Sequence, residues 1–83
     1  MLKVNYIECC NDYKITVVLS NGLAGIFDVR PYLDKGIFTQ LNNIDYFKQV
    51  KINFAGIYWP NGQDFSADTI EYFLQPVAHV KVS

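Results

Sequence analysis

The segment YKITVVLSNGLAGIFD (residues 13–28) decides the fold of this 83-residue chain. Apolar and polar side chains alternate over residues 13–20, which is typical of a β-strand with one buried face. Asn21 and Gly22 follow, and an Asn-Gly pair between two strand-like segments is the strongest short-range signal of a β-hairpin. A two-residue turn predicts a register that places Leu19 opposite Ala24, Val17 opposite Ile26 and Ile15 opposite Asp28. Asp28 is therefore expected on the inward face.

The segments on both sides of this hairpin extend the pattern. Residues 2–9 form a third candidate strand, which can pair with residues 13–20 through a tight turn at Asn11 and Asp12. Residues 30–35 predict a short helix or turn, because Pro31 suits a first helical position and Gly36 suits a helix end. A second brief helix is expected after Asn43, a good N-cap, with Asp45 in its first turn and Tyr46 and Phe47 facing inward.

The second half of the chain predicts two short strands and a last helix. Residues 50–53 and 57–59 are the strands, and residues 54–56 form a three-residue hairpin loop between them. Ser66 is the expected N-cap of the last helix, whose inward stripe is Ile70, Phe73 and Leu74. The sequence predicts a single α+β domain over residues 1–83 with two layers: an antiparallel β-meander plus a second short hairpin, with short helices packed on one face. Residues 76–83 are either an extended tail or an added strand.

The only Trp of the chain marks a candidate recognition corner. Pro60 ends the strand that carries Trp59, and Asn61-Gly62 reverses the chain before Asp64. The candidate binding residues are Tyr58, Trp59, Asp64 and Asp28. The aromatic side chains that could form an exposed patch with them are Phe65, Tyr72 and Phe73. The same residues also have structural interpretations, because carboxylates cap turns and helix ends and a thin domain needs large aromatics in its core.

Composition and motifs argue against several function classes. Seven Lys plus Arg against eight Asp plus Glu give a net charge of −1, and the cations are scattered, so nucleic acid is not expected as a partner without an extra domain. His79, Cys9 and Cys10 are too few for a zinc site or an evident nucleophile with its base, so no metal, no cofactor and no catalytic residue is predicted. Adjacent cysteines and the lack of a long apolar segment or leader predict a cytoplasmic protein without a membrane partner.

A series of short motifs along the chain resembles a known bacterial family. These motifs are Asn21-Gly22, Phe27-Asp28-Val29-Arg30, Gly36-Ile37-Phe38 and Trp59-Pro60-Asn61-Gly62-Gln63-Asp64. Over roughly residues 6–73 the chain resembles domain-of-unknown-function family 2442 (DUF family 2442). The resemblance implies a small two-layer α+β fold and no assigned activity. It also implies a frequent genetic neighbour, another small protein, in an arrangement that looks like a toxin and antitoxin pair, and some longer relatives continue into a helix-turn-helix domain.

Three functions follow from these observations. The leading interpretation is a non-enzymatic interaction module that binds a protein partner, or a second copy, through an aromatic surface near Tyr58 and Trp59 or through a sheet edge. An antitoxin-like role toward a neighbour-encoded protein is one form of it. The first alternative is a small-ligand or enzymatic site at the Asp28, Trp59 and Asp64 corner. The second is an accessory role in nucleic-acid-binding regulation, which rests on the longer relatives.

Overall fold

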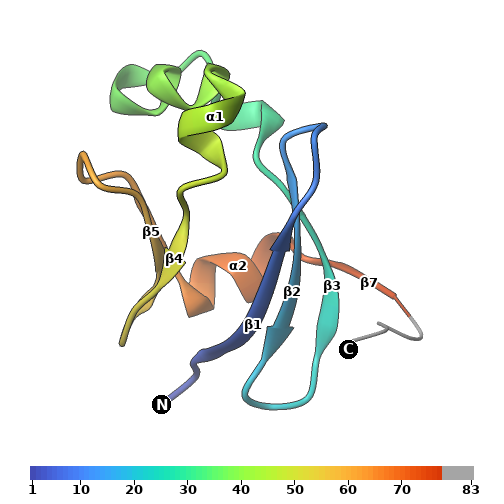
Figure 1. Cartoon of the computed structure of the whole chain (residues 1–83). Coiled ribbons are helices and arrows are strands. Elements are labelled where there is room, and N and C mark those ends of the chain that lie inside the picture. Colours follow the sequence, from blue (N-terminus) through green and yellow to red (C-terminus); the bar gives the residue numbers. More distant parts are fainter. Residues whose placement is uncertain (78–83) are drawn as a thin grey trace.

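The strands of the computed structural model, which describes residues 1–77, form two antiparallel sheets (Figure 1). The first sheet has the order β1 (Val4–Cys9), β2 (Lys14–Leu19), β3 (Ala24–Asp28) and β7 (Gln75–Pro76). The second has the order β4 (Lys51–Ile52), β5 (Gly56–Tyr58) and β6 (Asp64–Ser66). The α+β class, the meander and the second hairpin are confirmed, and β6 is a strand that the sequence did not predict.

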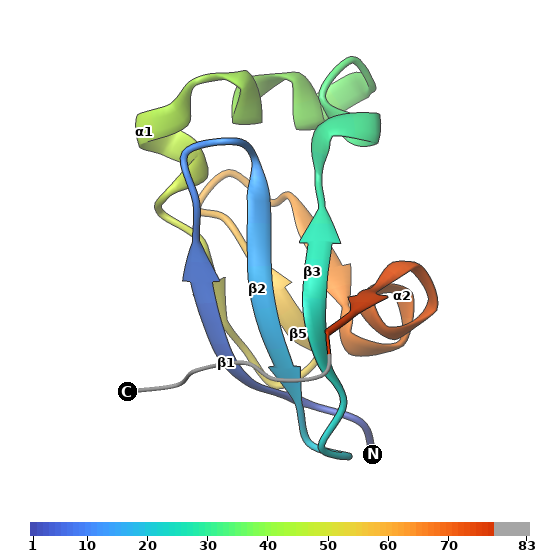
Figure 2. The same ribbon diagram turned by 90° about the vertical axis from the view of Figure 1, so that its right-hand side faces the viewer.

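The helices are short, and the N-caps of the two α-helices are those that the sequence predicts. The two 3₁₀ helices are η1 (Arg30–Tyr32) and η2 (Gly36–Asn42), and the two α-helices are α1 (Ile44–Phe47) and α2 (Ala67–Phe73). The side chain of Asn43 accepts hydrogen bonds from the backbone N–H groups of Asp45 and Tyr46, and Ser66 accepts one from Thr69 (3.2 Å). The first three helices lie together beyond one end of the sheets (Figure 2).

The register predicted for the β2–β3 hairpin is wrong by one residue. Ile15 pairs with Phe27 and Val17 with Gly25, because the loop has three residues instead of two. The N–H of Gly22 donates to the carbonyl of Leu19 (3.0 Å), and Gly22 has a φ of +87°. This geometry is that of a turn followed by a left-handed glycine, the usual three-residue hairpin loop.

The corrected register exchanges the two faces of β3. The inward residues are Gly25, Phe27 and Val29, all buried, whereas Ile26 and Asp28 are half-buried on the opposite face. Asp28 therefore does not point into the core, contrary to the prediction. A shift of one residue reverses every side chain of a strand, because the side-chain period of a strand is two.

The reversal predicted at Pro60 uses the same kind of loop. The N–H of Gly62 donates to the carbonyl of Trp59 (3.1 Å), and the N–H of Trp59 donates to the carbonyl of Gln63 (2.9 Å). Gly62 has a φ of +100°. The β4–β5 loop lies one residue earlier than predicted, because Gly56, the expected last loop residue, already belongs to β5, and the N–H of Asn53 bonds its carbonyl (2.9 Å).

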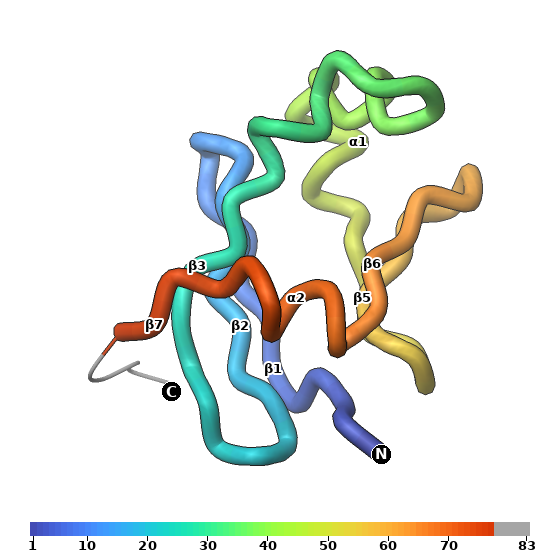
Figure 3. Tube along the Cα trace, turned by 180° about the vertical axis from the view of Figure 1, so that it is seen from behind, coloured from blue at the N-terminus to red at the C-terminus, as the bar shows by residue number. Residues whose placement is uncertain are grey.

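The core lies between the two sheets. The rings of Phe27 on β3 and Phe65 on β6 meet edge to face, with centroids 5.0 Å apart, so they join the sheets directly. Helix α2 leads from β6 back to β7, which lies beside β3 (Figure 3). Ile70 on its inner side is buried, whereas Phe73, expected on the same stripe, is 53% exposed. The other fully buried side chains include Ile15, Val17, Leu19, Leu41, Phe47, Ile57 and Trp59.

Residues 75–77, the last that the structure describes, join the first sheet. Gln75 and Pro76 pair with β3, and the N–H of Val77 donates to the carbonyl of Ala24 (3.1 Å). These residues form an added edge strand. Residues 78–83, including His79, lie outside the described part of the chain. Among residues 1–77, no helix has the length and apolar character needed to cross a membrane.

Candidate functional site

Trp59 belongs to the core and not to the surface. Its side chain is 1% exposed, and its indole N–H donates to the backbone carbonyl of Phe47 (2.8 Å). The ring also packs against Phe47 and Phe65, with centroids 6.0 and 5.9 Å away. The prediction that Trp59 anchors a binding surface is therefore wrong. A domain of this size needs its largest ring for packing, and the backbone carbonyl satisfies the N–H.

The proposed corner of Asp28, Trp59 and Asp64 is not one site. Asp28 lines a pocket of about 220 Å³, the α2 pocket, together with Pro31, Tyr32, Phe73 and Gln75. Asp64 lines a different pocket of about 290 Å³, the β6 pocket, together with Phe38, Asn53, Ala55, Ile57, Phe65, Ser66 and Thr69. The structure thus separates the two carboxylates and places Trp59 in neither lining.

Asp28 is held by Arg30. The guanidinium donates from Nε (3.0 Å) and Nη2 (2.7 Å) to the two carboxylate oxygens, and the backbone N–H of Arg30 donates to Oδ1 (3.0 Å). The side-chain hydrogen bonds from Arg30 lower the pKa of the Asp28 carboxyl, with smaller contributions from the backbone N–H and from charge. An ionised carboxylate in such a pair is a poor general acid or base near neutral pH. Its evident role is to fix the turn from β3 into η1.

This ion pair makes the free energy of unfolding depend on pH in the acid range. Since the folded-state pKa of Asp28 lies below the unfolded value of about 3.9, its contribution is present above that value and is lost as the pH falls through the folded pKa. Between pH 5 and pH 2, we expect the free energy of unfolding to fall less for Asp28→Asn than for the natural chain. Urea unfolding at each pH measures this change. Asp34→Asn controls for removal of a surface carboxylate. Identical slopes for Asp28→Asn and the natural chain would contradict the prediction.

The other two candidates, Tyr58 and Asp64, lie opposite each other on neighbouring strands. Tyr58 on β5 pairs with Lys51 on one side and with Asp64 on the other. Tyr58 is half-buried and Asp64 is exposed. Within residues 1–77, no salt bridge includes the Asp64 carboxylate. Asp64 therefore presents an unneutralised charge beside the β6 pocket.

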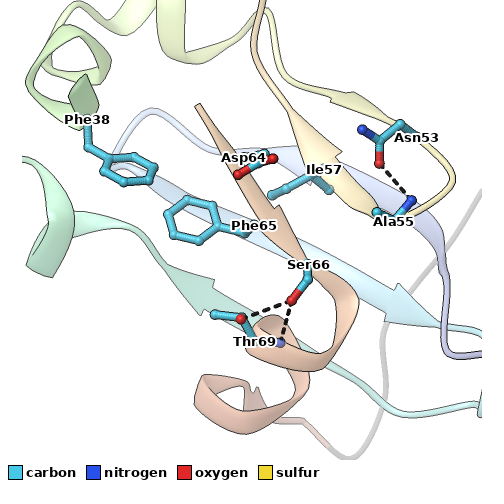
Figure 4. Close-up of a pocket in the computed structure, with 8 residues that line it drawn as sticks. All are labelled: Phe38, Asn53, Ala55, Ile57, Asp64, Phe65, Ser66 and Thr69. Atoms are coloured by element: carbon cyan, nitrogen blue, oxygen red, sulfur yellow. Dashed lines mark hydrogen bonds between the residues drawn. The ribbon is translucent and has the colours of Figure 1, made fainter. Parts of the chain in front are cut away.

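The β6 pocket runs along β6 (Figure 4). The ring of Phe38 from η2 lies at one end and the turn with Asn53 and Ala55 at the other. Ser66 and Thr69 close one side, with their hydroxyl oxygens 3.0 Å apart. The lining is mixed: aromatic at the Phe38 end, where its ring stacks on Phe65 at 5.1 Å, and polar at the other end. Such a surface suits a ligand that has both apolar and polar groups.

An aromatic cluster connects the two pockets. The ring of Tyr32 lies 4.9 Å from that of Phe65, 6.0 Å from Phe38 and 6.5 Å from Phe73. Tyr72 is 81% exposed and meets Phe73 edge to face at 4.8 Å. Tyr72 and Phe73 were among the aromatic candidates, but Tyr32 and Phe38 were missed. The sequence predicts a short helix or turn for residues 30–35, and no local feature there or at Phe38 indicates that these rings pack toward α2.

A buried polar network also escaped the sequence analysis. Gln63 is 1% exposed, and its Oε1 accepts from the hydroxyl of Tyr46 (2.7 Å) while its Nε2 donates to the carbonyl of Ile37 (2.8 Å). The same hydroxyl accepts from the backbone N–H of Asn61 (2.8 Å). These bonds fasten the loop before β6 to α1 and η2, and so they position the β6 pocket.

Removing one hydroxyl tests this network. We expect Tyr46→Phe to lower the free energy of unfolding by about 1–3 kcal/mol, because Gln63 Oε1 and the N–H of Asn61 each lose a partner. Equilibrium urea unfolding measures the loss. Tyr72→Phe removes a hydroxyl from an 81% exposed side chain and should change stability by less than about 0.5 kcal/mol. Equal effects of the two substitutions would contradict a structural role for the network.

The groups that could serve a metal or a nucleophile are not assembled. Among the described residues, no three His, Cys, Asp or Glu side chains lie close enough to hold a metal ion. Cys9 is half-buried, and burial is the main cause that raises the pKa of its thiol. A thiol with a raised pKa is a weaker nucleophile at neutral pH, because less thiolate is present.

The comparisons with known proteins add one match. The family model described as "Protein of unknown function (DUF2442)" matches residues 4–75. No curated protein and no solved structure matches the chain.

Proposed function

The chain belongs to the DUF2442 family, whose description assigns no activity, and we propose from its exposed surface that it is a non-enzymatic module that binds a protein partner. The observation that carries the proposal is the pair of exposed rings on α2. Tyr72 is 81% exposed and Phe73 53% exposed, and the two rings touch edge to face. Aromatic side chains that are accessible in the free protein are common anchors of protein interfaces.

The surroundings of these rings support an interface. Phe73 lines the α2 pocket with Tyr32, and the aromatic cluster continues from there to the β6 pocket. A partner could therefore insert an apolar side chain into the α2 pocket beside Phe73. Two of the three candidate groups for chemistry have other roles, since Asp28 is paired with Arg30 and Trp59 is buried. This distribution favours binding over catalysis.

The partner that we propose is a small protein encoded beside this one in a bacterial genome. The family resemblance supports it, because members frequently have such a neighbour. The proposal places both proteins in the cytoplasm, since adjacent Cys9 and Cys10 with no third Cys suit a reducing compartment. Self-association through the same surface would produce a dimer instead.

Co-expression with the product of the adjacent gene tests the proposal. We expect the two proteins to co-purify, and we expect Tyr72→Ala with Phe73→Ala to weaken the complex by about tenfold or more in isothermal titration calorimetry. Phe54→Ala is the matched control, because Phe54 is 67% exposed but lies on the β4–β5 loop and lines neither the α2 pocket nor the β6 pocket. Failure to co-purify, or equal affinities for the double variant and the control, would contradict the proposal.

A further inference from the structure

The free edge of β6 is the second part of this surface. Resting on the proposed function, we propose that β6 receives an extended segment of the partner as an additional antiparallel strand, with a Lys or Arg of that segment beside Asp64. Three features of the described residues lead to this inference: unpaired backbone groups on β6, a pocket along the strand, and the charge of Asp64.

The hydrogen-bond pattern leaves one edge of β6 unused. The N–H of Trp59 donates to the carbonyl of Gln63, and the N–H of Ala67 donates to that of Ala55, both at 2.9 Å. In an antiparallel pair, bonded positions alternate along each strand. Asp64 lies at a position between them, so its N–H and C=O point away from β5. No residue of the described part of the chain hydrogen-bonds these two groups.

The β6 pocket provides space along the same strand. It has a volume of about 290 Å³ and follows the strand from Phe38 to the Asn53–Ala55 turn (Figure 4). Adding a strand to an exposed edge supplies main-chain hydrogen bonds, and pockets for alternate side chains supply specificity. The rings of Phe38 and Phe65 suit an apolar side chain of the incoming segment. The site therefore fits a short extended chain with one apolar residue near a polar one.

The charge of Asp64 in its cross-strand row determines which polar residue of the incoming strand fits beside it. Lys51, Tyr58 and Asp64 lie opposite one another on β4, β5 and β6. A strand added beyond β6 would place its own residue next to Asp64 in this row. Opposite charges in directly facing positions stabilise a sheet and like charges destabilise it. Because no salt bridge within residues 1–77 neutralises Asp64, a basic residue fits this position and an acidic one does not.

A synthetic peptide tests the inference on the full chain. The probe is acetyl-Thr-Val-Lys-Val-Thr-amide, added to the ¹⁵N-labelled protein. We expect the amide resonance of Asp64 to shift and its hydrogen exchange to slow. Replacing the Lys by Glu should weaken binding by about fivefold or more. Methylation of the backbone nitrogen of the Lys should weaken peptide binding by about threefold or more, because that backbone N–H would donate to the carbonyl of Asp64. N-methylation of a neighbouring Val, whose N–H points away, should have little effect.

Charge reversal in the protein completes the test. Asp64→Lys should prefer the Glu peptide, whereas Asp34→Lys, which makes the same change of net charge at a side chain 85% exposed, should keep the preference for the Lys peptide. Equal binding of the Lys and Glu peptides would overturn the inference. Binding of N-acetyl-lysine amide as tightly as the peptide would also overturn it, because it would indicate a small-ligand pocket. An unchanged Asp64 amide, together with a partner complex that depends on Tyr72 and Phe73, would refute the edge inference and leave the proposed function standing.

Discussion

Replacing Trp59 by alanine is expected to lower the free energy of unfolding by about 3–5 kcal/mol, the range for a large aromatic removed from a core. The side chain is 1% exposed and packs between Phe47 and Phe65. Domains are typically stable by only about 5–15 kcal/mol. The variant should therefore unfold at a much lower urea concentration, which circular dichroism measures without depending on the Trp signal.

Trp59→Phe is the informative companion to this variant. It keeps most of the apolar contacts but removes the indole N–H that bonds the carbonyl of Phe47. We expect it to lose about 1–3 kcal/mol, less than the alanine variant. If Trp59→Ala retained nearly all of the stability and instead abolished partner binding, Trp59 would be a surface anchor and the burial described above would be wrong.

The second large effect is expected at Gly56, where a methyl group has no room. A Cβ at this position would lie 2.1 Å from the carbonyl oxygen of Phe65 and 2.9 Å from the backbone N of Ala67. Both are backbone atoms, so β6 and the start of α2 would have to move away from β5. Overpacking typically costs about 1–3 kcal/mol. Because the clashing atoms belong to the backbone and not to a flexible side chain, we expect Gly56→Ala to lose about 3 kcal/mol or more.

Gly62→Ala is the matched control, because the two glycines meet different constraints. No atom lies within 4 Å of a Cβ at Gly62, but its φ is +100°. The substitution strains only the backbone of one residue, at about 1–2 kcal/mol. Urea unfolding of both variants separates steric exclusion from conformational strain. Equal losses, or a smaller loss at Gly56, would contradict the close approach of β5 and β6. Gly56→Ala, which displaces β6, should also lose the slowing of hydrogen exchange at Asp64 that the peptide causes.

The elements that could be predicted are those whose cause is local. Asn43 and Ser66 cap their helices through backbone groups two or three residues away, so neighbouring residues suffice to identify them. Pro60 and Gly62 similarly determine the reversal after Trp59. The register of the first hairpin failed because an Asn-Gly pair also fits a three-residue loop with glycine in the left-handed region. That single residue moved Asp28 to the other face of its strand.

The strand β6 could not be predicted from its own three residues. Asp64–Ser66 is too short to show a period, and it becomes a strand only because the preceding loop returns it beside β5. The buried amide of Gln63 has the same origin, since its partners Tyr46 and Ile37 are distant in sequence. The pocket along β6 depends on both, because its walls come from η2, the β4–β5 hairpin, β6 and α2.

The sequence by itself determined the α+β class, the order of the first strands, the helix caps and the chain reversals, because these depend on interactions between near neighbours. Only the tertiary structure decided which aromatic side chains are accessible. Trp59 is buried and Tyr72 is exposed, although the sequence favoured Trp59 as a binding residue and indicated Tyr72 only as a candidate member of an aromatic patch. The reason is that burial depends on which distant segments pack together, and here the segments of Phe47 and Phe65 enclose Trp59 while none of the described residues covers Tyr72.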